Sequence, residues 1–315
     1  MTDPSQISVG VTTPSSPSAA ETAPAPDGAQ NKERNASLWA DAGRELIRNP
    51  VFVIAAFVVV AVLSMAVLPW LWTSTDPQHC LLKFGKDGAT AGHIFGYSEQ
   101  GCDYYAQAIY GAGPSIAVAV LATSGSILFG CLTGILAGYY GGWVDGLISR
   151  LTDIFLGLPF LLGALTLLSL MSVRNVWSVV FALVVLGWPY ITRIMRGSVI
   201  ATKDMDYVHA AKSLGASDLR IIFRHVLPNA IAPVIVVATI SLGGYVGAEA
   251  TLTFIGVGLR PPIVSWGVMI TVGTKWVLAG TPHLLLVPVG FLVATVLSFI
   301  LMGDAVRDAL DPKLR

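Results

Sequence analysis

Long runs of apolar residues constrain this chain of 315 residues more than any other feature of its sequence. A helix needs roughly 20 mostly apolar residues to cross the hydrocarbon core of a bilayer. Because only 12% of the residues are charged, the chain has too few polar side chains to cover a surface that faces water on all sides. We therefore predict an all-α integral membrane protein with about six transmembrane helices. The six candidate spans cover residues 51–72, 115–139, 151–171, 176–192, 230–257 and 283–302.

Sequence motifs of catalysis and of nucleotide binding are absent. A phosphate-binding loop needs the pattern GxxxxGK[ST], but Cys80 stands where the first glycine before Gly85–Lys86 is required. The HExxH and GxSxG patterns do not occur, and the three cysteines have no metal-binding spacing. We expect no enzymatic activity, bound cofactor or bound metal in this chain. Its formal net charge of zero gives no argument for a nucleic-acid partner.

The lysines and arginines are distributed unevenly between the two sides of the membrane. With six spans both termini lie on the same side, and most of the 19 Lys and Arg residues fall there. Basic residues are concentrated in cytoplasmic loops, so we predict an inner or plasma membrane protein with both termini in the cytoplasm. The basic residues on the other side are Lys83, Lys86, Arg174, Arg260 and Lys275.

The spans divide the chain into segments of different character. Residues 1–30 are rich in Ser, Thr, Pro, Ala and Gly, a composition typical of disorder. The charged stretch that follows can form a surface helix leading into the membrane. We predict a disordered tail over 1–30, a juxtamembrane segment and first span over 31–73, an external loop over 74–114, a core of five spans over 115–303 and a cytoplasmic tail over 304–315.

Cys80 and Cys102 flank a polar part of the predicted external loop. Disulfides persist in oxidising compartments, so a Cys80–Cys102 bond is expected if the loop lies outside. Two free thiols are the alternative. Cys131 lies in an apolar run and is interpreted as a small packing residue.

The segment YVHAAKSLGASDLRIIFRHVLPN, residues 207–229, contains the signals of two short helices. Asp204 or Asp206 can cap the start of the first helix. Gly215 is suited to end it, because glycine tolerates the left-handed terminal position. Ser217 can cap the second helix. The sequence therefore predicts a helix–Gly–helix element on the basic side of the membrane.

Ala210, Ala211 and Leu214 give the first of these helices a small apolar face. A small amphipathic helix can lie in the groove of a partner protein, and it can equally lie on the lipid surface. The residues alone leave both interpretations of the loop 203–228 open.

Glu249 is a charge within the predicted fifth span, near its outer end. Charged side chains inside a membrane are costly and often functional. One interpretation is that Glu249 lines an external gate or vestibule, or pairs with Arg260. The other is that it caps a helix break before Gly256 and Gly258.

Two acidic residues near the cytoplasmic side have structural interpretations. Asp153 is expected to interact with Arg150 at the cytoplasmic end of the third span. Asp145, in the sequence GGWVDG, is interpreted as a turn residue. Neither is assigned to substrate binding.

The loop 203–228 resembles the EAA signature of binding-protein-dependent ABC importer permeases. In that signature EAA is followed by three residues, Gly, nine residues and Ile-x-Leu-Pro. His209 replaces the usual Glu, and His225 stands where Ile is common, as in the RHxLPN form of the peptide-importer branch. The resemblance assigns that Glu to contact with an ATPase, so His209 is expected either to hydrogen-bond the partner or to lie solvated at the interface rim. The residues in register are Ala210, Ala211, Gly215, Leu227 and Pro228.

Further segments, in the same order, resemble the dipeptide, oligopeptide and nickel permeases of this family over residues ~40–315. The segment 93–115 departs from the family pattern at Tyr97, Ser98, Cys102 and Gly113. Two of the family residues lost at these four positions are arginines. The segments are HIFGYSEQGCDYYAQAIYGAGPS (93–115), GYYGGWVDGLISRLTDIFLGLP (138–159), WPYITRIMRGSVI (188–200), EATLTFIGVGLRPPIVSWG (249–267) and GDAVRDALDPKLR (303–315).

This resemblance implies a type I ABC importer permease fold with a cytoplasmic coupling helix. It implies a second homologous permease, two ATPase subunits that bind ATP and Mg, an external solute-binding protein and a peptide substrate. Nickel or another small solute is an alternative cargo. A secondary transporter driven by an ion gradient and a structural membrane scaffold are alternatives from other classes. The implied coupling residues are His209, Ala210, Ala211, Leu214, Gly215, Ala216, Leu227 and Pro228.

Overall fold

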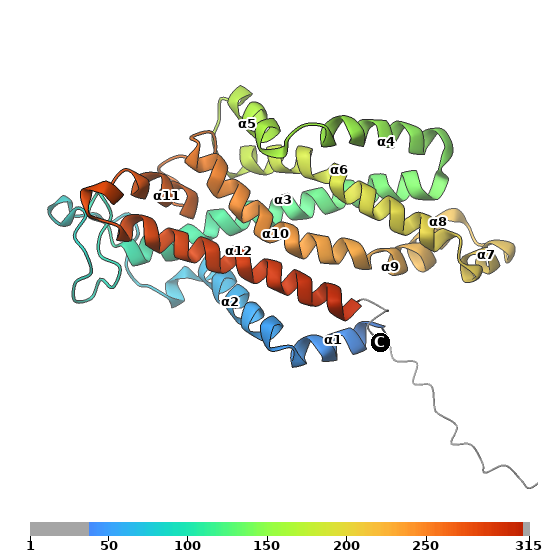
Figure 1. The fold of residues 1–315 in the computed structure, drawn as a ribbon, viewed down its shortest axis with the longest axis horizontal. Helices are drawn as coiled ribbons and strands as arrows, with labels where there is room; N and C mark the ends of the chain where they lie inside the picture. Colours follow the sequence, from blue (N-terminus) through green and yellow to red (C-terminus); the bar gives the residue numbers. More distant parts are fainter. Residues whose placement is uncertain (1–37, 311–315) are drawn as a thin grey trace, which may run out of the picture. The chain divides into compact units, whose positions relative to one another are not determined.

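The computed structural model describes residues 38–310, with side chains from residue 43 onward. This part of the chain consists of helices joined by turns and loops and contains no β-strand (Figure 1). The predicted all-α class is therefore confirmed for it. The predicted disordered tail, 1–30, and residues 311–315 of the predicted cytoplasmic tail lie outside the described residues.

Five of the described helices are long and apolar enough to cross a membrane. Two further helices, α4 (Gly142–Leu156) and α5 (Phe160–Leu170), meet the same test together as one span bent by 86°. The prediction of about six spans is confirmed in this form. The five continuous helices are α2 (Pro50–Val67), α3 (Tyr104–Tyr140), α6 (Val176–Lys203), α10 (Ala232–Phe254) and α12 (His283–Leu310).

The prediction of one continuous helix over 151–171 is wrong. Gly157 is the C-cap residue of α4, and Pro159 is the N-cap residue of α5. A proline has no N–H to continue a helical hydrogen-bond ladder, and its ring disfavours helical backbone at the residue before it, Leu158. The Gly-Leu-Pro sequence therefore ends α4 and changes the direction of the chain, although most of the surrounding residues are apolar.

Helix α3 starts well before the predicted span 115–139. The Asp103 side chain accepts a hydrogen bond from the Ala106 N–H at 2.7 Å and so caps the helix at Tyr104. The predicted external loop over 74–114 consequently ends at Asp103, and its last part is helical.

The fourth and sixth predicted spans also continue further than expected. Helix α6 runs past residue 192 to Lys203, and α12 runs past residue 302 to Leu310. These added turns contain charged residues, so the predicted apolar runs stop short of them. The segment predicted as a tail over 304–315 thus begins as part of α12.

Helices α3 and α6 pack closely because α3 carries glycines four residues apart. Residues four apart share one face of a helix, and small residues allow membrane helices to approach one another. A Cβ atom added at Gly130, Gly134 or Gly138 would come within 2.5, 2.7 or 2.9 Å of a Cβ atom on α6. The α6 residues at these three positions are Ile191, Met195 and Val199.

Short elements gather at the two opposite ends of the long helices (Figure 1). The predicted surface helix before the first span is present as α1 (Leu38–Arg48). Between α6 and α10 lie α7 (Asp206–Ser213), α8 (Asp218–Ile221), a π-helical turn (Ile222–Val226) and α9 (Leu227–Ala230). At the other end lie 3₁₀ turns (Pro69–Leu71, Leu82–Phe84 and Val277–Ala279) and helix α11 (Trp266–Thr274).

Candidate coupling element and translocation cavity

The chain between α6 and α10 forms the predicted helix–Gly–helix element. Gly215 has a φ of +81°, the left-handed conformation that glycine adopts without strain. Its N–H donates to the Lys212 carbonyl at 3.0 Å, and the Ala216 N–H donates to the Ala211 carbonyl at 3.1 Å. These two bonds form a Schellman motif, which ends α7 and turns the chain toward α8.

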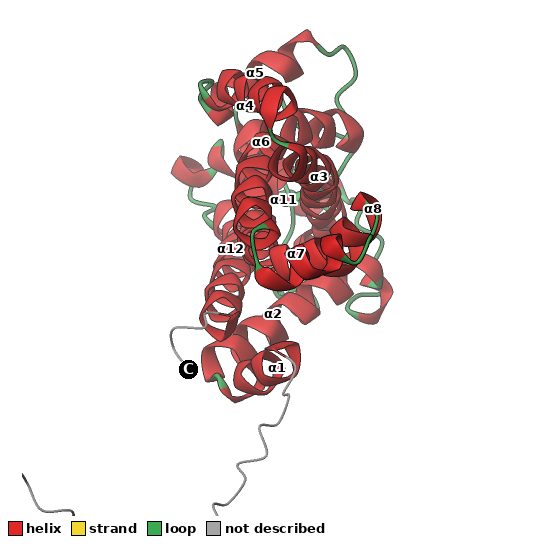
Figure 2. Ribbon diagram, turned by 90° about the vertical axis from the view of Figure 1, so that its right-hand side faces the viewer, coloured by secondary structure: helices red, strands yellow, loops and turns green. Residues whose placement is uncertain are grey.

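Most residues assigned to coupling by resemblance lie at the surface of this element, which faces the viewer in Figure 2. Leu214 is 88% exposed, and the neighbouring Leu219 and Phe223 are 65% and 64% exposed. Exposed large apolar side chains gathered in one short segment are typical of an interaction site. His209, Ala210, Leu214, Gly215 and Pro228 are exposed, whereas Ala211, Ala216 and Leu227 are half-buried.

Buried contacts attach this element to the long helices. Val208 of α7, Ile221 of α8 and Val226 of the π turn are buried in one apolar cluster with side chains of α6. The Tyr139 hydroxyl at the end of α3 donates to Asp218 Oδ1 at 2.7 Å. These contacts attach α7 and α8 to both α3 and α6.

The helix caps differ from the sequence expectation. The N-cap residue of α7 is Met205, so neither Asp204 nor Asp206 caps that helix through its side chain. Ser217 holds the N-cap position of α8, but its side chain makes no capping hydrogen bond. Asp218, in the first turn of α8, instead accepts the bond from Tyr139.

A π-helical turn over Ile222–Val226 was not predicted from the sequence. The Leu227 N–H donates to the Ile222 carbonyl, one residue further back than in an α-helix. Pro228 has no N–H for the Arg224 carbonyl, so a regular helix cannot continue through this point. Pro228 is the one signal in the sequence for this break.

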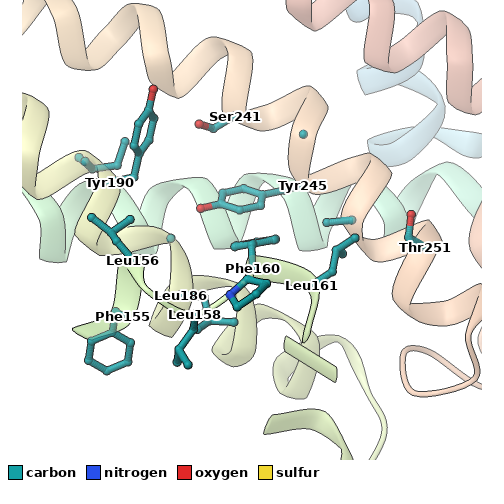
Figure 3. A pocket seen from close by; sticks show the side chains of 15 residues that line it. Phe155, Leu156, Leu158, Phe160, Leu161, Leu186, Tyr190, Ser241, Tyr245 and Thr251 are labelled. Carbon is teal, nitrogen blue, oxygen red and sulfur yellow. The ribbon is translucent and has the colours of Figure 1, made fainter. Parts of the chain in front are cut away.

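A cavity of about 720 Å³ lies between the α4–α5 break, α6 and α10 (Figure 3). Its wall is mainly apolar and aromatic, with hydroxyl groups as polar points and no charged side chain among its lining residues. This volume is within the range of small-molecule sites. The lining residues are Phe155, Leu156, Leu158, Pro159, Phe160, Leu161, Leu186, Gly187, Tyr190, Ile191, Ser241, Gly244, Tyr245, Ala248 and Thr251.

Tyr245 of α10 occupies the centre of this wall (Figure 3). Its ring stacks on Phe160, with centroids 6.3 Å apart. Its hydroxyl lies 3.0 Å from the Ser126 hydroxyl of α3, over the backbone of Gly187 in α6. A Cβ atom at Gly187 would lie 1.9 Å from the Tyr245 oxygen, so only glycine leaves room for this arrangement.

Glu249 is fully buried and joins three elements through hydroxyl groups. Ser115 of α3 donates to Oε2 at 3.0 Å. Thr253 of α10 and Ser265, the N-cap residue of α11, donate to Oε1 at 3.0 and 3.1 Å. These bonds satisfy the carboxyl group inside the protein and hold the start of α11 against α3 and α10.

The pairing of Glu249 with Arg260, one of the interpretations of the sequence, is not observed. The Arg260 guanidinium instead donates to the Gly256 carbonyl at 3.3 Å. The alternative is support of the helix break that follows α10. Thr253, which donates to Glu249, also accepts the Leu259 N–H at 3.1 Å and so links Glu249 to that break. Glu249 does not line the 720 Å³ cavity, and its assignment to a gate stays a prediction.

Two ion pairs connect α4 and α6 near the end that carries α7. Arg196 donates to Asp145 through Nε and through Nη2, the latter at 2.7 Å, and Arg193 pairs with Asp153. The expectation that Asp153 interacts with Arg150 and that Asp145 is only a turn residue is therefore corrected. The extension of α6 beyond residue 192 brings both arginines alongside α4.

Comparison with protein families decides what kind of protein carries these features. Residues 130–315, more than half of the chain, match the family described as binding-protein-dependent transport system inner membrane component. The chain belongs to this family. Residues 37–82 of the permease match a second family, described as the N-terminal TM domain of oligopeptide transport permease C.

Individual relatives align with nearly the whole permease. It is 33% identical over 279 residues to the dipeptide transport system permease protein DppC of Alkalihalophilus pseudofirmus, which covers 89% of this chain and 91% of that protein. It is 31% identical over 289 residues to the oligopeptide transport system permease protein OppC of Bacillus subtilis, which covers 92% and 94%.

A solved structure supports the fold of the permease. The inward-facing MetNI methionine ABC transporter resembles it with a TM-score of 0.52 and 19% identity, over 64% of this chain and 96% of that chain. At this identity the likeness concerns the fold alone. The predicted membership in the ABC importer permeases, and a multi-pass membrane location, are confirmed by the family match and the apolar helices.

The end of the permease away from α7 contains a disulfide-bonded loop. Cys80 and Cys102 are bonded in the structure, and the Leu81 N–H beside them donates to the Gly101 carbonyl at 2.9 Å. In the part of the chain that the structure describes, no group of three or more His, Cys, Asp or Glu residues is arranged to hold a metal ion.

Sequence reasoning missed the residues of the cavity. Tyr190, Ser241 and Tyr245 lie inside or at the end of apolar runs, where a single hydroxyl is an ordinary occurrence. Gly187 was a weak signal, because a glycine inside a helix often marks a close approach. Only the packing of α6 against α10 brings Gly187 and Tyr245 together.

Proposed function

We propose that this permease subunit imports dipeptides and oligopeptides and forms half of the translocation pathway. The observation that carries the proposal is the alignment of nearly the whole chain with permeases named for dipeptide and oligopeptide transport. The other half of the pathway is a second, homologous permease.

The cavity between α5, α6 and α10 is the part of the pathway that this subunit contributes. Its volume of about 720 Å³ suits a short peptide. The hydroxyl groups of Tyr190, Ser241 and Thr251 offer hydrogen bonds to peptide groups of any sequence (Figure 3). An uncharged wall neither traps nor repels acidic and basic side chains, which suits a transporter of varied peptides.

The loop 203–228 couples this permease to ATP binding and hydrolysis in the ATPase subunits. The exposed side chains of Leu214, Leu219 and Phe223 dock on one of two ATPase subunits, which bind ATP and Mg. His209 is exposed at the same element and can hydrogen-bond the ATPase. Closure of the ATPase pair moves α7 and α8, and the buried contacts with α6 carry that movement to the cavity.

The orientation follows from charge. Both termini and the coupling element lie in the cytoplasm, as the excess of Lys and Arg on that side indicates. Residues 74–103, with the Cys80–Cys102 bond, lie outside, where an oxidising compartment maintains the disulfide. An external solute-binding protein delivers the peptide there.

Competition uptake in cells that lack this chain tests the proposal. Restoring the chain should restore uptake of a labelled dipeptide, and unlabelled dipeptides and longer peptides should compete while nickel does not. Uptake should stop when cellular ATP is depleted with the ion gradient kept in place. Competition by nickel alone would assign a different cargo, and uptake that persists without ATP would assign a secondary transporter.

A further inference from the structure

Residues 98–101 form a rigid turn at the end of the permease opposite α7. The Ser98 N–H donates to the Cys102 carbonyl at 2.8 Å, and the Leu81 N–H donates to the Gly101 carbonyl at 2.9 Å. Gly101 has a φ of +77°, and a Cβ atom there would lie 1.9 Å from the Leu81 oxygen. The disulfide at Cys102 closes this frame, so the turn presents Glu99 and Gln100 in fixed positions.

A second cavity, of about 520 Å³, lies between this turn and α11. On one side it is lined by amide and carboxyl side chains, chiefly Gln78, Glu99, Gln100 and Gln107. The other wall is apolar and comes from residues 261–264 and from α11, where Val268 is typical. This cavity shares no lining residue with the one beside Tyr245.

Glu99 is the one charged residue that lines this second cavity. The Trp276 indole N–H donates to Glu99 Oε2 at 2.6 Å, and the Lys86 ammonium lies 3.8 Å from the centroid of the Trp276 ring. Within residues 43–310, Glu99 has no salt bridge and its Oε1 accepts no hydrogen bond. The carboxylate is thus held in place while one oxygen stays available to a cation.

We propose that this cavity binds the free amino end of a short peptide before it enters the membrane pathway. The α-ammonium group pairs with Glu99, in a charge-assisted hydrogen bond. The glutamine side chains both donate and accept, as the amide groups of a peptide require. The apolar wall receives a side chain of the peptide. This inference rests on the proposed function, since it takes the cavity to lie on the side from which peptide arrives.

Equilibrium dialysis of the full-length chain in lipid nanodiscs tests the inference with three labelled probes. Trialanine and trialanine amide should bind with the same affinity, because no cationic side chain lines the cavity to pair with the peptide carboxylate. N-acetyl-trialanine, which lacks the ammonium group, should bind at least about tenfold more weakly. This comparison uses the unaltered chain, so it does not depend on any variant folding.

Two variants assign the effect to the cavity. Glu99→Gln should weaken trialanine binding by about tenfold and remove the preference over the acetylated probe. Asp87→Asn is the matched control, because Asp87 is an exposed acid of the same loop that does not line the cavity. It should leave trialanine binding unchanged.

Equal binding of trialanine and its acetylated form would overturn the inference, as would unchanged binding in Glu99→Gln. A loss of binding-protein association in Glu99→Gln without a change in trialanine affinity would make this turn a protein-docking surface and would also overturn it. These failures are distinct from failure of the proposed function. That function is tested by peptide uptake in cells, with its nickel competition and ATP depletion, and none of those outcomes depends on Glu99.

Discussion

Gly187 and Tyr245 show how one atom decides the shape of the proposed pathway. They lie on different helices, and the Tyr245 hydroxyl occupies the volume that any side chain at position 187 would need. That hydroxyl is held by Ser126, and the ring is held by Phe160. Because Gly187 has no Cβ, the Tyr245 ring can take its position in the wall of the cavity.

Replacement of Gly187 by Ala should displace Tyr245 from this position. Overpacking of this kind costs about 1–3 kcal/mol, so we expect a lower thermal unfolding midpoint of the purified chain and reduced peptide uptake. Gly197→Ala on the same helix is the control, because no atom lies within 4 Å of a Cβ added there. Adding Tyr245→Phe to Gly187→Ala removes the nearer of the two clashing oxygens, at 1.9 Å, and leaves only the Ser126 hydroxyl, at 2.8 Å, so it should recover most of the loss. No recovery in the double variant would place the cause elsewhere.

At the scale of elements, two glycine-containing breaks shape the fold. The Gly-Leu-Pro sequence over 157–159 bends the third span and opens one side of the cavity. Gly215 separates α7 from α8 and gives the coupling element its turn. In both cases the chain direction changes where a helical ladder cannot continue.

Changing Gly215 to Val should damage coupling through the backbone rather than through side-chain contacts. A β-branched residue in the left-handed conformation costs about 1–2 kcal/mol or more, although no neighbouring atom opposes the added Cβ. We expect less ATPase to co-purify with the permease, and lower uptake. Asn tolerates this conformation, so Gly215→Asn should behave nearly as the unaltered chain. If the Val variant retains both ATPase binding and uptake, the turn has no role in docking.

At the scale of the whole molecule, the two ends of the described residues have different chemistry. One end carries the exposed apolar side chains of α7, α8 and the π turn, and the other carries a disulfide-bonded loop with its own cavity. The long helices connect them, and the ion pairs between α4 and α6 lie toward the first end. This difference between the two ends suits a subunit that receives solute at one end and contacts an ATPase at the other.

Labelling of single cysteines tests the proposed orientation. In a Cys131→Ser background, Thr90→Cys and Ser217→Cys place thiols at exposed positions of the two ends. A membrane-impermeant maleimide added to intact spheroplasts should label the first variant but not the second. Opening the membrane should make the second react as well. The reverse pattern would invert the topology.

Local sequence determined the class of this protein. Apolar runs of about 20 residues are long enough to cross the hydrocarbon core of a bilayer, and the turn at Gly215 that ends α7 follows from backbone sterics that act within a few residues. The same local character explains the wrong prediction for 151–171, because run length outweighed a Gly-Leu-Pro signal. The resemblance of the loop 203–228 and of further segments to a known family placed the chain among importer permeases, which the family match confirms.

Only the tertiary structure decided the contacts between distant residues. The carboxyl group of Glu249 meets hydroxyls of Ser115 and Ser265, and not Arg260, because α3 and the start of α11 converge on α10. Likewise, the Tyr245 wall and the cavity at Glu99 exist because separate elements pack together. A periodic pattern states which face of a helix is apolar, whereas the partner of each side chain depends on how the helices pack, and no single segment encodes that.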